Sequence, residues 1–228
     1  EWEGYGLADA LARQFHTLIV VENDINASTI GLHENYTSSQ VKNMLFLYLD
    51  DGIGASVVIG NKLYKSRRNF SGELSFMDIG RWEKERSATH SLEELVKQLL
   101  AEGRREELQD IVARLLLNTC CVLDPDLVVI DSTHLNQQDI DAIRQRFERL
   151  LGTGAYTPDI VVTQVGSLLY TKGLFSLCKS RMPAARRIVC KRSPSPKIPP
   201  GQSDSGNKSH WIVASYMLSR LTKNCRSA

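Results

Sequence analysis

Short apolar runs alternate with amphipathic stretches along most of this chain, and the alternation predicts an α/β fold. The branched run Leu18–Val21 is typical of a buried strand, and the polar turn Asn23–Asn26 favours the start of a helix that ends near Glu34. Met44–Leu49 is apolar at every position, which indicates a strand covered on both faces. Further strands are predicted at residues 55–59, 62–65, 127–130 and 160–163, and further helices at residues 6–15, 92–100, 106–121, 137–151 and 167–178.

Three glycines punctuate the strands in the first third of the chain. Gly60 and Asn61 lie between two β-type runs and predict a hairpin. Gly52 and Gly54 permit a backbone to approach a ligand closely, and exposed amides there suit a phosphate. A simple glycine-rich turn explains the same pair equally well.

Asp24 is the first candidate for function because it follows a predicted strand. Ligands of open α/β sheets collect at the carboxyl ends of strands. The alternative is that Asp24 only caps the helix that follows it.

The character of the chain changes after Met182. Residues 183–210 are basic and rich in proline and serine, which predicts a disordered, solvated segment in preference to a nucleic-acid contact. Trp211–Leu221 has some helical periodicity. We therefore expect a domain over residues 1–182 and a largely disordered tail over residues 183–228.

Composition narrows the classes of protein but does not select one. The formal charge is +2, from 28 basic and 26 acidic residues, so no strong field favours nucleic acid or membrane. Neither a membrane span nor a signal peptide is evident, which favours a cytoplasmic protein. The five cysteines form no C-x-x-C pair and no histidine stands at ligand spacing from them, so free thiols and no metal site are expected.

Five blocks of sequence form a set with a characteristic order and spacing. The blocks are Trp2–Gly4, Val21–Ala27, Asp51–Gly54 leading to Gly60–Tyr64, Ser71–Leu74 and Leu123–Ile130. Together they resemble the ROK family of sugar kinases and sugar-responsive repressors. That resemblance implies an actin-like, two-lobed fold of the sugar kinase/actin superfamily, with the ligand between the lobes and the N-terminal lobe truncated in this chain.

The resemblance also implies roles for individual residues. In kinases of this family the aspartate matching Asp24 accepts the proton of a sugar hydroxyl, which suits phosphoryl transfer. Asn23 and Glu73 match its sugar-binding neighbours. Asp51, Gly52 and Gly54 match the hairpin that holds ATP phosphates.

Several positions depart from the kinase pattern. Asp50 and Asp51 place carboxylates where a triphosphate would approach, and a like-charge pair about 4 Å apart costs roughly 4 kcal/mol at an effective dielectric near 20. A bridging Mg²⁺ would reverse that sign. Asp131–His134 replaces a glycine-rich nucleotide loop, Phe76 replaces a histidine, and Asp78–His90 contains none of the cysteines of the zinc site.

Three hypotheses follow from this comparison. The first is a sugar-binding sensor of a ROK repressor, which needs no ATP, Mg²⁺ or zinc, forms homo-oligomers, and contacts DNA only through a helix-turn-helix domain absent from this chain. The second is an ATP-dependent sugar kinase in which Asp24 is the catalytic base. The third is a remnant domain that binds no ligand.

Overall fold

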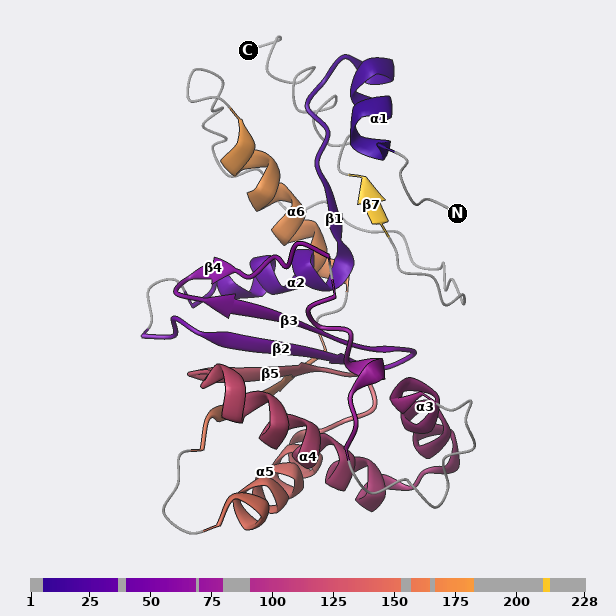
Figure 1. Ribbon diagram of the computed structural model, residues 1–228, viewed down its shortest axis with the longest axis vertical. Coiled ribbons are helices and arrows are strands. Elements are labelled where there is room, and N and C mark those ends of the chain that lie inside the picture. The colour runs from indigo at the N-terminus through magenta and orange to yellow at the C-terminus, as the bar shows by residue number, and fades with distance from the viewer. Residues whose placement is uncertain are drawn as a thin grey trace.

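A five-stranded mixed sheet forms the centre of the molecule (Figure 1). The computed structural model describes residues 6–36, 40–68, 70–79, 91–152, 157–164, 167–182 and 211–213. In spatial order the strands are β4 (Lys62–Leu63), β3 (Ile53–Ile59), β2 (Met44–Leu49), β5 (Leu127–Asp131) and β6 (Asp159–Thr163). Strands β2, β5 and β6 run parallel, whereas β3 is antiparallel to both β2 and β4. The parallel strands therefore end at one edge of the sheet, where β3 begins.

Helices cover both faces of this sheet, which explains why β2 and the first four residues of β5 are apolar. On one face lie α3 (Leu92–Glu102), α4 (Arg105–Leu123) and α5 (Gln137–Leu151), packed on alternate strand residues such as Leu45 and Leu47. On the other face lie α2 (Asp24–His33) and α6 (Ser167–Arg181), packed near Met44 and Phe46. The alternation of side chains along β2 thus divides the core into two layers.

Glycines allow α2 and α6 to cross with their backbones almost in contact. A Cβ on Gly173 of α6 would lie 1.7 Å from the carbonyl oxygen of Ala27, and a Cβ on Gly31 of α2 would lie 2.1 Å from that of Leu169. Separations this short are possible only where no side chain intervenes. The crossing fixes α2, and α2 carries the candidate residue Asp24 at its first position.

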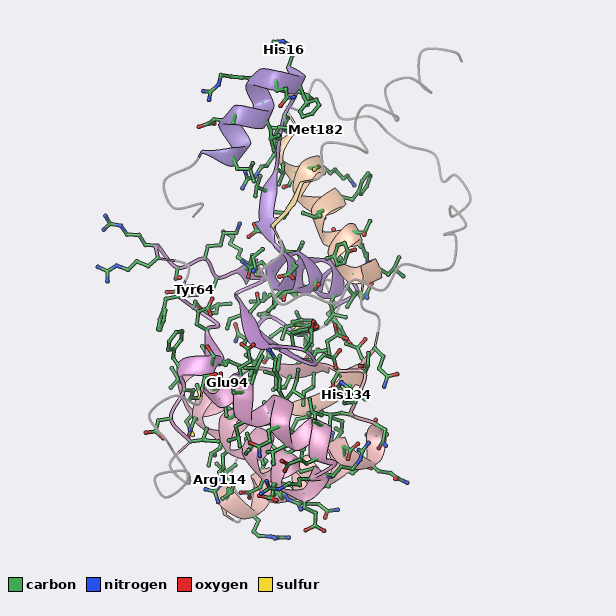
Figure 2. The ribbon with its side chains drawn as sticks, turned by 90° about the vertical axis from the view of Figure 1, so that its right-hand side faces the viewer. His16, Tyr64, Glu94, Arg114, His134 and Met182 are labelled. Atoms are coloured by element: carbon green, nitrogen blue, oxygen red, sulfur yellow. The ribbon has the colours of Figure 1, made fainter. Side chains whose placement is uncertain are left out.

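The N-terminal elements lie apart from the sheet. Helix α1 (Leu7–Phe15) has no buried residue, and β1 (Val21–Asn23) pairs antiparallel with β7 (Trp211–Val213). His16, just after α1, and Met182, just after α6, both lie at the opposite end of the molecule from Arg114 of α4 (Figure 2).

Most of the predicted elements are present, with two corrections. The strand expected at Leu18–Val21 begins at Val21 and does not join the main sheet. Trp211–Val213, at the start of the stretch with some helical periodicity, form the strand β7, because Trp, Ile and Val favour extended pairing along β1. The predicted disorder of residues 183–210 lies outside the described residues, as do the block Trp2–Gly4 and most of Asp78–His90.

Candidate functional site

The edge at which β2 and β5 end brings together candidate residues from separate parts of the sequence. Asp50 follows the last residue of β2, Asp131 is the last residue of β5, and Gly54 lies at the start of β3. A Cβ on Gly54 would lie 2.5 Å from Ile25 Cδ1 and 4.0 Å from the carbonyl oxygen of Gly72. Asp24 and Glu73 are the chain neighbours of Ile25 and Gly72, so their backbones lie near this edge. We call these residues together the strand-end site.

Asn23 and Asp24 begin helix α2, and their roles there differ. Asn23 is the N-cap, since its side-chain oxygen accepts from the Asn26 amide at 3.1 Å. Asp24 is the first helical residue, and its carboxylate accepts from the Ile25 amide at 2.8 Å. The N-cap is thus Asn23 and not Asp24, although Asp24 also accepts a hydrogen bond from an amide of the first turn. Its half-buried carboxylate lies in the first turn, where the helix dipole stabilises negative charge.

Glu73 lies in a turn that is attached to β3. The turn depends on Gly72, whose φ of +94° favours glycine and whose carbonyl oxygen accepts from the Ala55 amide at 2.9 Å. Leu74 is buried and anchors the short 3₁₀ helix η1 (Leu74–Phe76). The Glu73 side chain is exposed, so it is accessible to a ligand.

Asp50 is bound by the segment that follows β5. Its carboxylate accepts from the Thr133 amide at 2.8 Å, from the Thr133 hydroxyl at 3.1 Å and from the Ser132 hydroxyl at 3.2 Å. His134 Nε2 lies 3.9 Å from Asp50 Oδ1, and the two side chains form an ion pair only when the histidine is protonated. The donors in this segment are thus directed at a carboxylate of the protein itself.

Asp51 and Tyr48 form a second polar pair at the same edge. The Tyr48 hydroxyl donates to Asp51 at 2.6 Å. Burial of the ring, this hydrogen bond, and the negative charges of Asp51, Asp50 and Asp131 together raise the pKa of Tyr48 far above its usual range. The strand-end site is therefore a region of negative potential.

The two glycines matched to the phosphate hairpin have different surroundings. Gly54 is buried, and a Cβ there would meet Ile25 Cδ1, the end of a side chain that can shift. A Cβ on Gly52 would meet no atom within 4 Å. The role of Asp51, Gly52 and Gly54 in phosphate binding stays a prediction.

Glu22 is a buried carboxylate that the sequence alone did not single out. It is 5% exposed, pairs with Lys65, and accepts from the Asn26 side-chain amide at 3.1 Å. The pairing joins the segment after β4 to the start of α2. The sequence does contain an indication of this pairing. Glu22 directly follows a branched apolar run, and an acidic residue buried at the end of such a run requires a partner.

The described residues contain neither a metal-binding cluster nor a membrane-spanning helix. Within those ranges no three His, Cys, Asp or Glu side chains are grouped to hold a metal ion. No helix in the same ranges combines the length and the apolar character needed to cross a membrane.

The architecture is that of the actin-like sugar kinases and their repressor relatives. A ROK family glucokinase from Streptomyces griseus, solved with glucose and AMPPNP, superposes with a TM-score of 0.57 over 75% of this chain and 71% of that chain, at 20% identity. A ROK family transcriptional regulator, a homolog of the E. coli MLC protein, gives a TM-score of 0.61 over 75% of this chain and 55% of that one, at 13% identity. The predicted fold class is confirmed.

The sequence comparison finds a similarity to one family of proteins within this fold. The model of the ROK family matches residues 1–85, and the predicted resemblance to that family is confirmed. The xylose repressor of Bacillus spizizenii is 27% identical over 129 residues, which are 51% of this chain. The match spans 33% of the repressor, so this chain corresponds to about a third of its length.

Proposed function

We propose that this chain is the sugar-binding part of a ROK-type transcriptional regulator and that it does not transfer phosphate from ATP. The single observation that carries this proposal is the position of Asp50. Its carboxylate takes up three donors of the segment Asp131–His134, which follows β5. A phosphate approaching this edge would find those donors already bound to Asp50. It would also be repelled by the negative charges of Asp50 and Asp51.

Sugar binding is assigned to Asn23, Asp24 and Glu73. Asp24 and Glu73 present carboxylates at the strand-end site, and a carboxylate accepts hydrogen bonds from several hydroxyls at once. Asn23 uses its oxygen to cap α2, which leaves its amide group as a donor to a sugar oxygen. The similarity to a xylose repressor supports a sugar as the ligand.

The remaining features of this proposal concern the whole regulator. DNA is bound by a separate helix-turn-helix domain, the protein forms homo-oligomers, and neither zinc nor Mg²⁺ is required. A shift in the melting temperature of the intact regulator's operator complex on sugar addition would support this arrangement, whereas an operator complex indifferent to every sugar would contradict it.

A sugar kinase is the second candidate, and the retained Asp24 favours it. The similarity in fold to a glucokinase solved with a nucleotide analogue is in its favour as well. Under this alternative Asp24 is the general base, and Mg²⁺ offsets the charge of Asp50 and Asp51.

Thermal unfolding with a panel of sugars tests the sensing proposal. A ligand that binds only the folded state at 100 times its Kd adds about 2.7 kcal/mol to the free energy of unfolding. We expect such a shift with at least one of d-xylose, d-glucose and N-acetyl-d-glucosamine, and its loss in Asp24→Ala and Glu73→Ala. Glu148→Ala, an exposed carboxylate on α5, is the matched control. No shift with any sugar would favour a domain that binds no ligand.

A further inference from the structure

Two exposed phenylalanines flank Glu73. Phe70 is 61% exposed and Phe76 is 72% exposed, and their ring centroids lie 5.6 Å apart with planes inclined at 37°. Large apolar side chains that remain in water as a contiguous pair usually mark a contact surface. The structure therefore needs an explanation for apolar rings beside a carboxylate.

The backbone holds the two rings and the carboxylate in one compact turn. The Glu73 amide donates to the Phe70 carbonyl oxygen at 3.4 Å, and the Phe76 amide donates to the Glu73 carbonyl oxygen at 3.3 Å. Burial of Leu74 and the bond from Ala55 to Gly72 attach this turn to β3. The rings are thus positioned before any ligand arrives, which lowers the entropic cost of binding.

A carbohydrate has the two kinds of surface that this turn can recognise. Its hydroxyls donate to a carboxylate, and the C–H bonds on the faces of a pyranose ring form an apolar surface that packs on aromatic rings. When every ring hydroxyl is equatorial, only axial C–H bonds point away from each face. An axial hydroxyl on the stacked face would be directed at the aromatic rings and would lose its hydrogen bond to water.

Building on the proposed function, we propose that Phe70 and Phe76 form an aromatic platform on which one face of the bound pyranose stacks while Glu73 accepts its hydroxyls. The platform disfavours pyranoses that carry an axial hydroxyl on the stacked face. Phe76, which stands where the family has a histidine, then helps to determine which sugar binds.

Calorimetric titration with d-xylose, d-glucose and d-galactose tests the platform. An aromatic contact contributes about 0.5–1.5 kcal/mol, which is about a 2- to 12-fold change in Kd. We expect Phe76→Ala and Phe70→Ala each to weaken d-xylose and d-glucose binding about 3- to 10-fold, and Phe76→Trp to retain it. d-Galactose, with its axial hydroxyl, should bind more weakly than d-glucose. Phe175→Ala on α6 removes another exposed phenylalanine and should change nothing.

Saturation-transfer NMR provides a readout that a purely structural role would not alter. The axial protons of one sugar face should receive the strongest saturation, and this preference should vanish in the doubly substituted protein F70A/F76A. Unchanged affinities in both alanine variants, with binding lost in Glu73→Gln, would overturn the platform but leave the sugar-binding proposal intact. If the native chain binds none of the three sugars, both proposals fail.

Discussion

Replacing Gly173 by alanine tests whether the α2–α6 crossing positions the strand-end site. The new Cβ would lie 1.7 Å from the Ala27 carbonyl oxygen, and its other near neighbours, the Ala27 carbonyl carbon and the Gly31 amide nitrogen, are also backbone atoms. No rotamer change relieves such a contact. Because ordinary non-bonded separations are about 3.5 Å, the helices must move apart by roughly 1.5–2 Å.

Two opposing effects determine how much Gly173→Ala changes the free energy of unfolding. Inserting a methyl group into a closely packed interior costs about 1–3 kcal/mol, and a backbone clash belongs at the upper end of that range or above it. Alanine gains about 1 kcal/mol over glycine in intrinsic helix propensity, which offsets part of this cost. We expect the free energy of unfolding to fall by about 2 kcal/mol or more.

Urea unfolding followed by circular dichroism measures this change. Gly52→Ala is the matched control, because a Cβ there meets no atom within 4 Å and its φ is not in the left-handed region, so its effect should stay within about 0.5 kcal/mol. Sugar affinity should also fall in Gly173→Ala, since displacing α2 moves Asp24. Equal stability of Gly173→Ala and Gly52→Ala would refute the close crossing.

Three further results are expected. Asp139 is buried and bound by Arg105 and Gln109; burial favours a higher pKa, but these hydrogen bonds and that of the Asn136 amide outweigh it and lower the pKa. The ionised Asp139 therefore stabilises the fold above the ordinary carboxyl pKa of about 3.9, and this stability is lost as pH falls through the lowered pKa. In Asp139→Asn the free energy of unfolding should therefore depend less on pH in the acid range. Glu22→Gln leaves Lys65 without its buried partner and should lower the free energy of unfolding by about 1–3 kcal/mol in urea titrations, whereas an unchanged midpoint would contradict the pairing. Iodoacetamide should modify the exposed Cys121 well before the buried Cys120. Burial, and to a lesser degree the neighbouring Cys121, raise the pKa of Cys120 to about 11. Peptide mapping that finds Cys120 labelled first would contradict this.

Much of the main sheet could be predicted because its signals are local. The uniformly apolar Met44–Leu49 is a central strand, and helix α5 has the limits that its periodicity indicates. Strand β1 was misplaced because its partner β7 is nearly 190 residues away, and long-range pairing leaves little trace in local sequence.

The residues near the strand-end site are only partly indicated by local sequence. Motifs point to Asp24 and Glu73, whose chain neighbours Ile25 and Gly72 both lie close to Gly54. The hydrogen bonds of Asp50 to Ser132 and Thr133 depend on two parallel strands ending together, which no local pattern specifies. Glu22 was overlooked because its burial depends on Lys65, which follows the hairpin 43 residues later.

Whether this chain forms sugar phosphate from ATP decides between a sugar sensor and a sugar kinase. The chain is incubated with MgATP and each of d-xylose, d-glucose and N-acetyl-d-glucosamine, and both ADP and sugar phosphate are quantified, with Asp24→Asn as the reference for background turnover. We predict that at least one sugar binds while neither product rises above the level of Asp24→Asn. Equal amounts of ADP and sugar phosphate, formed by the native chain and abolished by Asp24→Asn, would contradict the account and assign the chain to the kinases.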